Sequence, residues 1–200
     1  LILNNDAVWR SDLLGGGRVL GFVDHLRKFR TLAQYAQERG WNYGEGYIEG
    51  VSGISQSAPH IAGKAMLPSD AIGDAGIDVS KITIASNRPI QSPRSKARFT
   101  PPMMLVHEQF DLHHDVWIKN YLTYKNQMVG FCAKAADFHL LSELADYLAH
   151  EKKVLRAFVA ATSVKLFTQH ATTLSAMDIF DLPYPDSGKL NLSPHEQILA

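Results

Sequence analysis

The sequence is poor in cysteine, because Cys132 is the only one among 200 residues. A disulfide within the chain therefore cannot form, and so low a cysteine content is typical of proteins from the reducing cytoplasm. Long apolar runs are also missing, since none reaches the roughly 18 residues that a membrane-spanning helix needs. Together these absences predict a cytoplasmic protein that does not associate with membranes.

An excess of charge of either sign is likewise absent, because 20 Lys and Arg residues balance 20 Asp and Glu residues. The total indicates no polyanionic partner, but the distribution along the chain does. The window from Lys81 to Gly130 contains seven cations and three acids, so its net charge is about four units positive. A local basic face is what phosphate binding requires, whatever the net charge. The seven cations are Lys81, Arg88, Arg94, Lys96, Arg98, Lys119 and Lys125.

Hydrophobic residues make up 46% of the chain, which is enough to bury a core. The pattern of these residues changes twice along the sequence and predicts an α+β fold in three segments. Residues 1–40 are expected to form a helical lead-in, and residues 41–136 a β-rich domain. Residues 137–200 are expected to form a helical hairpin followed by a C-terminal tail.

Apolar residues recur at three- and four-residue spacing in the first segment, which predicts an amphipathic helix. The stripe consists of Val19, Phe22, Val23, Leu26 and Phe29. Thr31 and Gln34 form a capping-box pattern that begins a second helix, and Gly40 is typical of a helix end.

Two further stripes, at residues 140–148 and 154–159, predict a pair of helices joined near residues 150–153. Ser175 and Asp178 suit the cap of a last short turn. Between the helical segments, glycine and proline interrupt short apolar runs, and some runs alternate with polar residues, which predicts strands. These runs are residues 61–67, 81–85, 103–107, 116–122 and 128–133.

The string ARFTPPMMLV at residues 97–106 resembles the "PRF–x–x–P–hydrophobic" pattern at the centre of a known family of domains. These are the C-terminal target-recognition domains of adenine-specific DNA methyltransferases in restriction–modification systems of type I and type IIG. An apolar helix at residues 140–148, Ser163 and the string DLPYP at residues 181–185 follow in the family's order. The LNS tripeptide that the family usually has between its helices is replaced by AHE at residues 149–151.

Two earlier strings, VWRSDLLGG at residues 8–16 and WNYGEGYIEG at residues 41–50, also resemble the segment that follows such a methyltransferase core. The resemblance implies that the chain binds a specific sequence in double-stranded DNA. Methyl transfer from S-adenosylmethionine would belong to an attached or partner methyltransferase domain, so this chain is expected to be non-catalytic and without a cofactor. Its first residue is Leu1 instead of methionine, and it ends abruptly at Ala200, so we interpret it as a fragment.

The alternation of Arg94, Lys96 and Arg98 is the strongest local signal for phosphate contacts. In an extended segment all three side chains would project from one face, about 6–7 Å apart, which is close to the phosphate spacing of one DNA strand. A solvated basic edge strand is the alternative interpretation. We expect backbone contacts at Arg88, Arg94, Lys96, Arg98, Lys119 and Lys125.

Base reading needs Arg, Asn or Gln at a groove edge, and the sequence does not choose among its amides. The candidates in the basic region are Asn87, Gln91, Asn120 and Gln127. The alternatives to DNA recognition are a module that docks a partner subunit through the helical hairpin, and a metal-dependent hydrolase that uses the histidines of the DLHHD string at residues 111–115.

Three further patterns imitate catalytic motifs, and each has a simpler structural interpretation. DLPY at residues 181–184 is similar to the acidic–Pro–Pro–aromatic tetrad of amino methyltransferases, but leucine replaces the first proline, and a helix stop is the simpler reading. Cys132 and His139 could be a nucleophile and its base, although a core cysteine is more ordinary. The histidines in DLHHD are adjacent, so on a strand they would point to opposite faces, which does not suit one metal ion.

Overall fold

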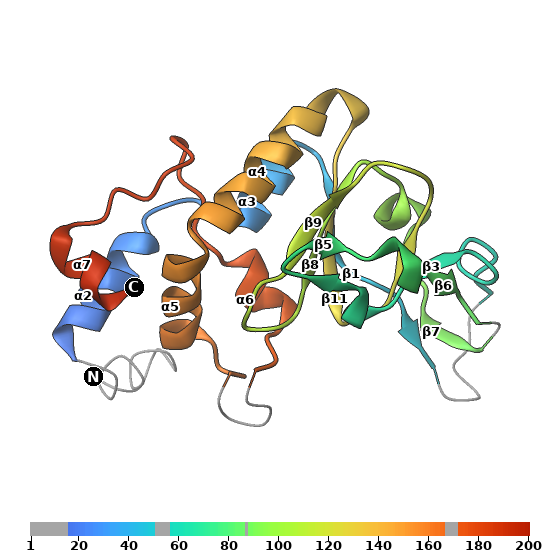
Figure 1. Cartoon of the computed structure of the whole chain (residues 1–200), viewed down its shortest axis with the longest axis horizontal. Coiled ribbons are helices and arrows are strands. Elements are labelled where there is room, and N and C mark those ends of the chain that lie inside the picture. The colour runs from blue at the N-terminus through green and yellow to red at the C-terminus, as the bar shows by residue number, and fades with distance from the viewer. Residues whose placement is uncertain (1–15, 51–56, 87, 167–171) are drawn as a thin grey trace. The chain divides into compact units, whose positions relative to one another are not determined.

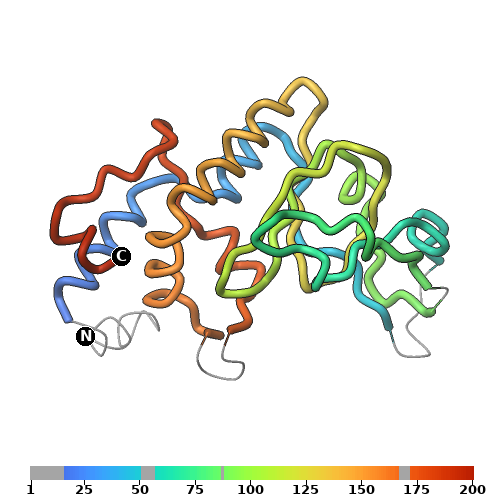
Figure 2. The backbone as a smooth tube through the Cα atoms, viewed as in Figure 1, coloured from blue at the N-terminus to red at the C-terminus, as the bar shows by residue number. Residues whose placement is uncertain are grey.

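The structure is a computed structural model that describes residues 16–50, 57–86, 88–166 and 172–200. It shows an α+β protein, in which helices accompany mostly antiparallel strands (Figures 1 and 2). The chain divides into two compact units. Unit 1 comprises residues 1–35, 109–112 and 146–200, and unit 2 comprises residues 36–108 and 113–145. All of the string at residues 8–16 except Gly16 lies outside the described residues.

A four-stranded antiparallel sheet forms the centre of unit 2. Its strands in spatial order are β1 (Asn42–Glu45), β11 (Met128–Cys132), β8 (Met103–His107) and β9 (His114–Trp117). The two middle strands pair along their whole length, from Met128 opposite His107 to Cys132 opposite Met103. All five residues of β11 are buried, so both faces of this strand are covered. The prediction of strands at residues 103–107 and 128–133 is therefore confirmed, with β11 one residue shorter than expected.

Short strands and 3₁₀ turns make up the rest of unit 2. The strands are β2 (Ile48–Glu49), β3 (Ala65–Leu67), β4 (Ile72–Gly73), β5 (Gly76–Ile77), β6 (Thr83–Ile84), β7 (Ile90–Ser92) and β10 (Thr123–Tyr124). The 3₁₀ turns are η1 (Ser69–Ala71), η2 (Val79–Lys81), η3 (Lys96–Phe99) and η4 (Ala135–Asp137). The strand expected at residues 116–122 ends at Trp117, because the Trp117 indole Nε1 donates a hydrogen bond of 2.7 Å to the Asn120 carbonyl and closes a turn.

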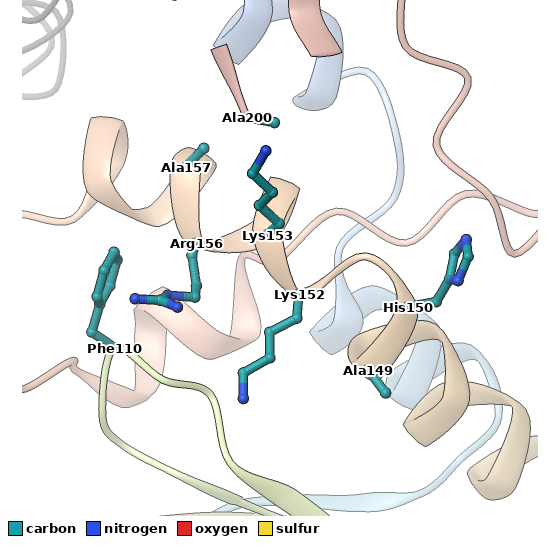
Figure 3. A pocket seen from close by; sticks show the side chains of 8 residues that line it. All are labelled: Phe110, Ala149, His150, Lys152, Lys153, Arg156, Ala157 and Ala200. Atoms are coloured by element: carbon teal, nitrogen blue, oxygen red, sulfur yellow. The ribbon is translucent and has the colours of Figure 1, made fainter. Parts of the chain in front are cut away.

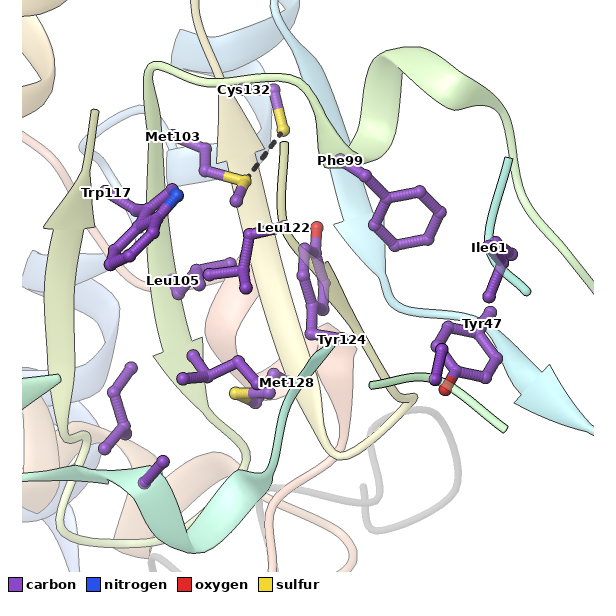
Figure 4. Packing of buried hydrophobic residues seen from close by; sticks show 14 of the residues in the cluster. Tyr47, Ile61, Phe99, Met103, Leu105, Trp117, Leu122, Tyr124, Met128 and Cys132 are labelled. Atoms are coloured by element: carbon purple, nitrogen blue, oxygen red, sulfur yellow. Dashed lines mark hydrogen bonds between the residues drawn. The ribbon is translucent and has the colours of Figure 1, made fainter. Parts of the chain in front are cut away.

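Phe99 and Tyr47 lie on one side of the unit 2 core, and Trp117 lies on the other (Figure 4). Phe99 is fully buried and packs edge-on against Tyr47, Tyr121 and Tyr124, with ring centroids 5.2–6.3 Å apart. Edge-to-face packing at such distances stabilises a pair of rings beyond the area that they bury. A Cβ atom at Gly130 would overlap the Tyr124 hydroxyl, so the central strand needs glycine opposite this ring.

The expected helices at the start of the chain are confirmed. α2 (Gly17–Leu26) buries four of the five stripe residues and ends before the fifth, Phe29. α3 (Leu32–Glu38) begins with a capping box, in which the Thr31 amide donates to Gln34 Oε1 at 2.8 Å and the Gln34 amide donates to Thr31 Oγ1 at 3.2 Å. Gly40 follows the helix with a φ of 67°, the left-handed conformation that glycine adopts most easily.

The expected helical hairpin is wrong in its connection. The helices themselves are present, α4 (Phe138–His150) and α5 (Lys152–Thr162), but only Glu151 separates them. The Glu151 amide donates the last helical hydrogen bond of α4, to the Tyr147 carbonyl, and the Glu151 carbonyl accepts the first one of α5, from the Leu155 amide, so the two helices meet at this single residue. A reversal of direction needs a loop of about 2–5 residues. The chain therefore has no loop with which to form a hairpin here.

Two short helices follow α5 in unit 1. α6 (Ala176–Phe180) begins with the expected cap, because Ser175 and Asp178 each bind the other's backbone amide. α7 (Pro194–Leu199) begins with a second capping box, between Ser193 and Glu196.

We expect Phe158→Asp to unfold unit 1 or to lower its stability sharply. Phe158 lies on α5 with 3% of its surface exposed. Removing a buried phenylalanine side chain costs about 3–5 kcal/mol, and an unpaired buried carboxylate adds to that loss. The measurement is the free energy of unfolding in urea. Lys153→Asp, at an exposed position of the same helix, is the matched control and should change this free energy by less than about 0.5 kcal/mol. Equal midpoints for the two variants would contradict the assigned burial of α5.

Candidate nucleic-acid interface

The segment that carries Arg94, Lys96 and Arg98 is not extended. Residues 96–99 form the 3₁₀ turn η3, and Arg94 has a φ of 60°. In a 3₁₀ turn, successive side chains are rotated by about 120°, so residues two apart point in different directions. The expectation that the three cations share one face is therefore wrong, and each has to be placed separately.

Arg98 is committed to strand β1. Its Nε donates to Asn42 Oδ1 at 2.6 Å, and its Nη1 donates to the Glu45 carbonyl at 3.0 Å. A Cβ atom at Gly44 would overlap Nη1, so the strand needs glycine where the guanidinium crosses it. Burial is the main cause that lowers the pKa of Arg98 below its usual value. Arg98 thus braces β1 against η3 instead of reaching the surface.

Arg94 and Lys125 are held by carboxylates. Arg94 Nη2 lies 3.2 Å from Glu45 Oε2, and its Nε donates to the Gly46 carbonyl at 3.1 Å. Lys125 Nζ lies 3.0 Å from Glu49 Oε1. Each charge is offset by a neighbour, so these two side chains contribute little to a basic surface.

Lys96 and Lys119, by contrast, come together at one cavity of about 690 Å³ in unit 2. We call it the lysine cavity. It also contains Lys64, which sequence reasoning missed, and all three lysines are exposed. Every residue that lines it is neutral or basic. The full set is Pro59, His60, Lys64, Lys96, Thr100, Pro101, Lys119, Asn120 and Tyr121.

The lysines of this cavity are not neutralised by neighbours. In the part of the chain that the structure describes, no acidic side chain pairs with Lys64 or Lys96. Lys119 Nζ lies over the Trp117 ring, 5.4 Å from its centroid, which is a contact that leaves the positive charge intact. The cavity therefore concentrates positive charge that a chain of zero net charge does not reveal.

The walls of the lysine cavity are anchored in the core. The ring of Tyr121 packs edge-on against Phe99, with centroids 6.2 Å apart, and burial raises the pKa of its phenol to about 12. His60 Nε2 lies 3.0 Å from the Arg94 carbonyl. The Trp117–Asn120 hydrogen bond closes the turn that carries Lys119. The exposed lysines thus extend from a rigid frame.

Arg88 is exposed and is not one of the residues that line this cavity. The sequence signal for Lys64 was weak, because this residue lies 17 positions before the basic window begins at Lys81, inside a run expected to be a strand. It reaches Lys96 and Lys119 only through the fold, because β3, which follows it, pairs with β10 next to residue 121.

The DLPY string at residues 181–184 has a structural role in unit 1. It follows α6, as a helix stop should. The Leu182 carbonyl accepts from the Leu32 amide at 3.0 Å, and the Tyr184 amide donates to the Arg30 carbonyl at 2.8 Å. The Tyr184 ring is 6% exposed and packs against Tyr35 and Tyr147. A ring so enclosed has no free face on which to stack a base.

Cys132 and the histidine string are also occupied by structural contacts. The Cys132 thiol donates to the Arg98 carbonyl at 2.9 Å, and burial raises its pKa to about 12, so it stays protonated. His113 Nδ1 lies 3.3 Å from Asp74, whereas His114 Nε2 lies 2.9 Å from the Ala145 carbonyl. Over the described ranges, no three His, Cys, Asp or Glu side chains lie close enough together to hold a metal ion.

A second basic cavity, of about 470 Å³, lies in unit 1 at the start of α5. Figure 3 shows that its cations diverge: Lys153 points toward Ala200, Lys152 points to the opposite side, and His150 points away from both. The Arg156 guanidinium carbon Cζ lies over the Phe110 ring, 4.5 Å from the ring centroid. Since these groups do not converge on one point, we assign the cavity no ligand.

We expect Arg98→Ala to lower stability strongly and Lys96→Ala to leave it almost unchanged, although the two residues belong to one basic string. Arg98→Ala removes two hydrogen bonds from a charged donor, each of which contributes about 1.5–3 kcal/mol. Arg98→Lys should restore little of this loss, because an ammonium cannot reproduce the forked geometry. Lys96→Ala should change the free energy of unfolding by less than about 0.5 kcal/mol. Urea denaturation of the three variants measures this, and a stable Arg98→Ala would show that the guanidinium does not brace β1.

In comparisons with known proteins, no family model matches this chain, and no curated protein matches it either. None of the helices among the described residues is both long and apolar enough to cross a membrane. The assignment of a function therefore depends on the sequence resemblance and on the geometry of unit 2.

Proposed function

We propose that unit 2 binds double-stranded DNA with the face that carries the lysine cavity. In this proposal the chain is the sequence-recognition module of an adenine-specific DNA methyltransferase from a restriction–modification system, located in the cytoplasm. Methyl transfer from S-adenosylmethionine belongs to an attached or partner domain. The observation that carries the proposal is the cluster of three exposed lysines around one cavity whose lining residues include no acid.

Phosphate binding suits this cluster for a physical reason. Lysine ammonium groups held near one another repel, and a polyanion relieves that repulsion while it releases its own condensed counterions. Lys64, Lys96 and Lys119 are free to make such contacts, since their charges are not offset by carboxylates. Arg88 is a further exposed cation of the same unit. Arg94, Arg98 and Lys125 do not line the cavity, and their bonds to Glu45, Asn42 and Glu49 leave them less suited to phosphate contacts.

The proposal predicts a loss of salt dependence when the three lysines are replaced together. The slope of log affinity against log salt falls by about 0.9 for each phosphate contact that is lost. The triple variant Lys64→Ala, Lys96→Ala, Lys119→Ala should therefore flatten this slope by roughly two to three units. Affinity for any duplex should fall by similar factors, because phosphate contacts carry no sequence information. Fluorescence anisotropy with a labelled mixed-sequence duplex, titrated at several salt concentrations, measures both quantities.

A control of equal charge replaces three exposed lysines that do not line the cavity: Lys28, Lys134 and Lys189. Alanine at these three positions should leave the slope nearly unchanged. If the triple variant of the cavity lysines has the slope and affinity of the parent chain, the lysine cavity does not contact DNA. A parent chain that binds no duplex at low salt would refute the proposed function as a whole.

A further inference from the structure

Phosphate contacts position a protein on DNA, whereas side chains at the base edges determine the sequence that it prefers. Asparagine and glutamine suit adenine, which presents N7 and the N6 amino group side by side in the major groove. One side-chain amide can donate to N7 and accept from the N6 amino group at the same time. The basic region between Lys81 and Gly130 contains six such amides, and the structure separates them. They are Asn87, Gln91, Gln109, Asn120, Asn126 and Gln127.

Four of these amides do not line the lysine cavity: Gln91, Gln109, Asn126 and Gln127. Gln109 Oε1 accepts a hydrogen bond of 2.8 Å from the Thr172 hydroxyl. Asn87 lies outside the described residues. Gln91 belongs to β7, in the ribbon that pairs with β2, and does not line the lysine cavity. Gln127 Oε1 accepts a hydrogen bond of 3.0 Å from the Ser69 hydroxyl, so its amide is held against its own chain.

Asn120 differs from the other described amides of this region in its position. It lines the lysine cavity, directly after Lys119, and Lys96 lines the same cavity from η3. Its backbone is fixed, because its carbonyl accepts from the Trp117 indole at 2.7 Å. Its side chain is exposed, and within the described residues the amide group has no hydrogen-bond partner. A free amide on a fixed backbone, in a cavity that unpaired cations also line, is the arrangement that base reading requires.

We propose that Asn120 is a specificity-determining residue, which reads an adenine in the major groove while the lysines of the cavity hold the adjoining phosphates. This inference rests on the proposed function, since it assigns a reader to the same surface. Asn120 is separable from the lysines in its effect. It carries no charge, so it contributes to the choice of sequence and not to the dependence of binding on salt.

The test begins with selection of duplexes from a random-sequence library by the parent chain. Asn120→Ala should then bind the selected duplex roughly 5- to 150-fold more weakly, and repeated selection should lose the preference for one A·T pair. The slope against log salt, and the affinity for random duplex, should match those of the parent. Asn126→Ala is the matched control, because Asn126 is an exposed asparagine of the same unit that does not line the cavity. Thermal melting of both variants checks that the fold is intact.

The outcomes separate the two proposals. An Asn120→Ala variant that selects the same sequence with the same affinity overturns the assignment of Asn120, while the proposed function stands. A parent chain that binds duplexes in a salt-dependent way but without sequence preference overturns this assignment and the sequence-recognition part of the proposed function, and leaves DNA binding by the lysine cavity standing. A parent chain that binds no duplex refutes the proposed function and the assignment with it. An Asn126→Ala variant that loses the same A·T preference, while Asn120→Ala keeps it, also overturns the assignment of Asn120, because the base-reading residue would then be Asn126.

Discussion

Arg98 is the residue on which the arrangement of unit 2 depends, because both its guanidinium and its backbone carbonyl make hydrogen bonds within the unit. Its guanidinium crosses β1 at Gly44 and bonds to Asn42 and the Glu45 carbonyl. Its own carbonyl accepts hydrogen bonds from the Tyr124 hydroxyl at 3.0 Å and the Cys132 thiol at 2.9 Å. These bonds fix the turn η3 against the sheet and the aromatic core. Lys96 at the start of η3, and the cavity wall that follows it, are thereby held at the surface.

The same constraint explains why counting charges along the sequence misplaces the basic surface. Of the seven cations in the window, Lys81, Arg94 and Lys125 contact carboxylates, and Arg98 is turned inward. A pattern of alternating cations predicts a common face only if the backbone is extended, and the 3₁₀ turn removes that condition. What is left is a smaller set of free cations, which the fold joins to a lysine from a distant part of the chain.

The parts of the structure that could be predicted from the sequence are those that depend on near neighbours. The capping boxes at Thr31 and Ser175, the stripes of α2 and α5, and the strand β8 are all encoded within a few residues, and each is confirmed. The lysine cavity depends instead on the pairing of β3 with β10, over 50 residues apart, which no local pattern reveals. The prediction of a loop between α4 and α5 was wrong for a local reason. The residues expected to form a connection, 150–153, lie within α4 and α5 except for Glu151.

A recognition surface has to combine a rigid frame with free polar groups, and these two demands conflict in most of the basic region. Side chains that form the frame, such as Arg94 and Arg98, use their donors internally and have few left for a ligand. The turn that follows Trp117 avoids this conflict, because a backbone carbonyl of that turn accepts the bracing hydrogen bond from the indole. The backbone of this turn is already ordered in the free protein. A ligand therefore has to order only the side chains of Lys119 and Asn120, which lowers the entropy cost of binding. For this reason the turn with Lys119 and Asn120 is better suited to contact DNA than the more strongly charged string at residues 94–98.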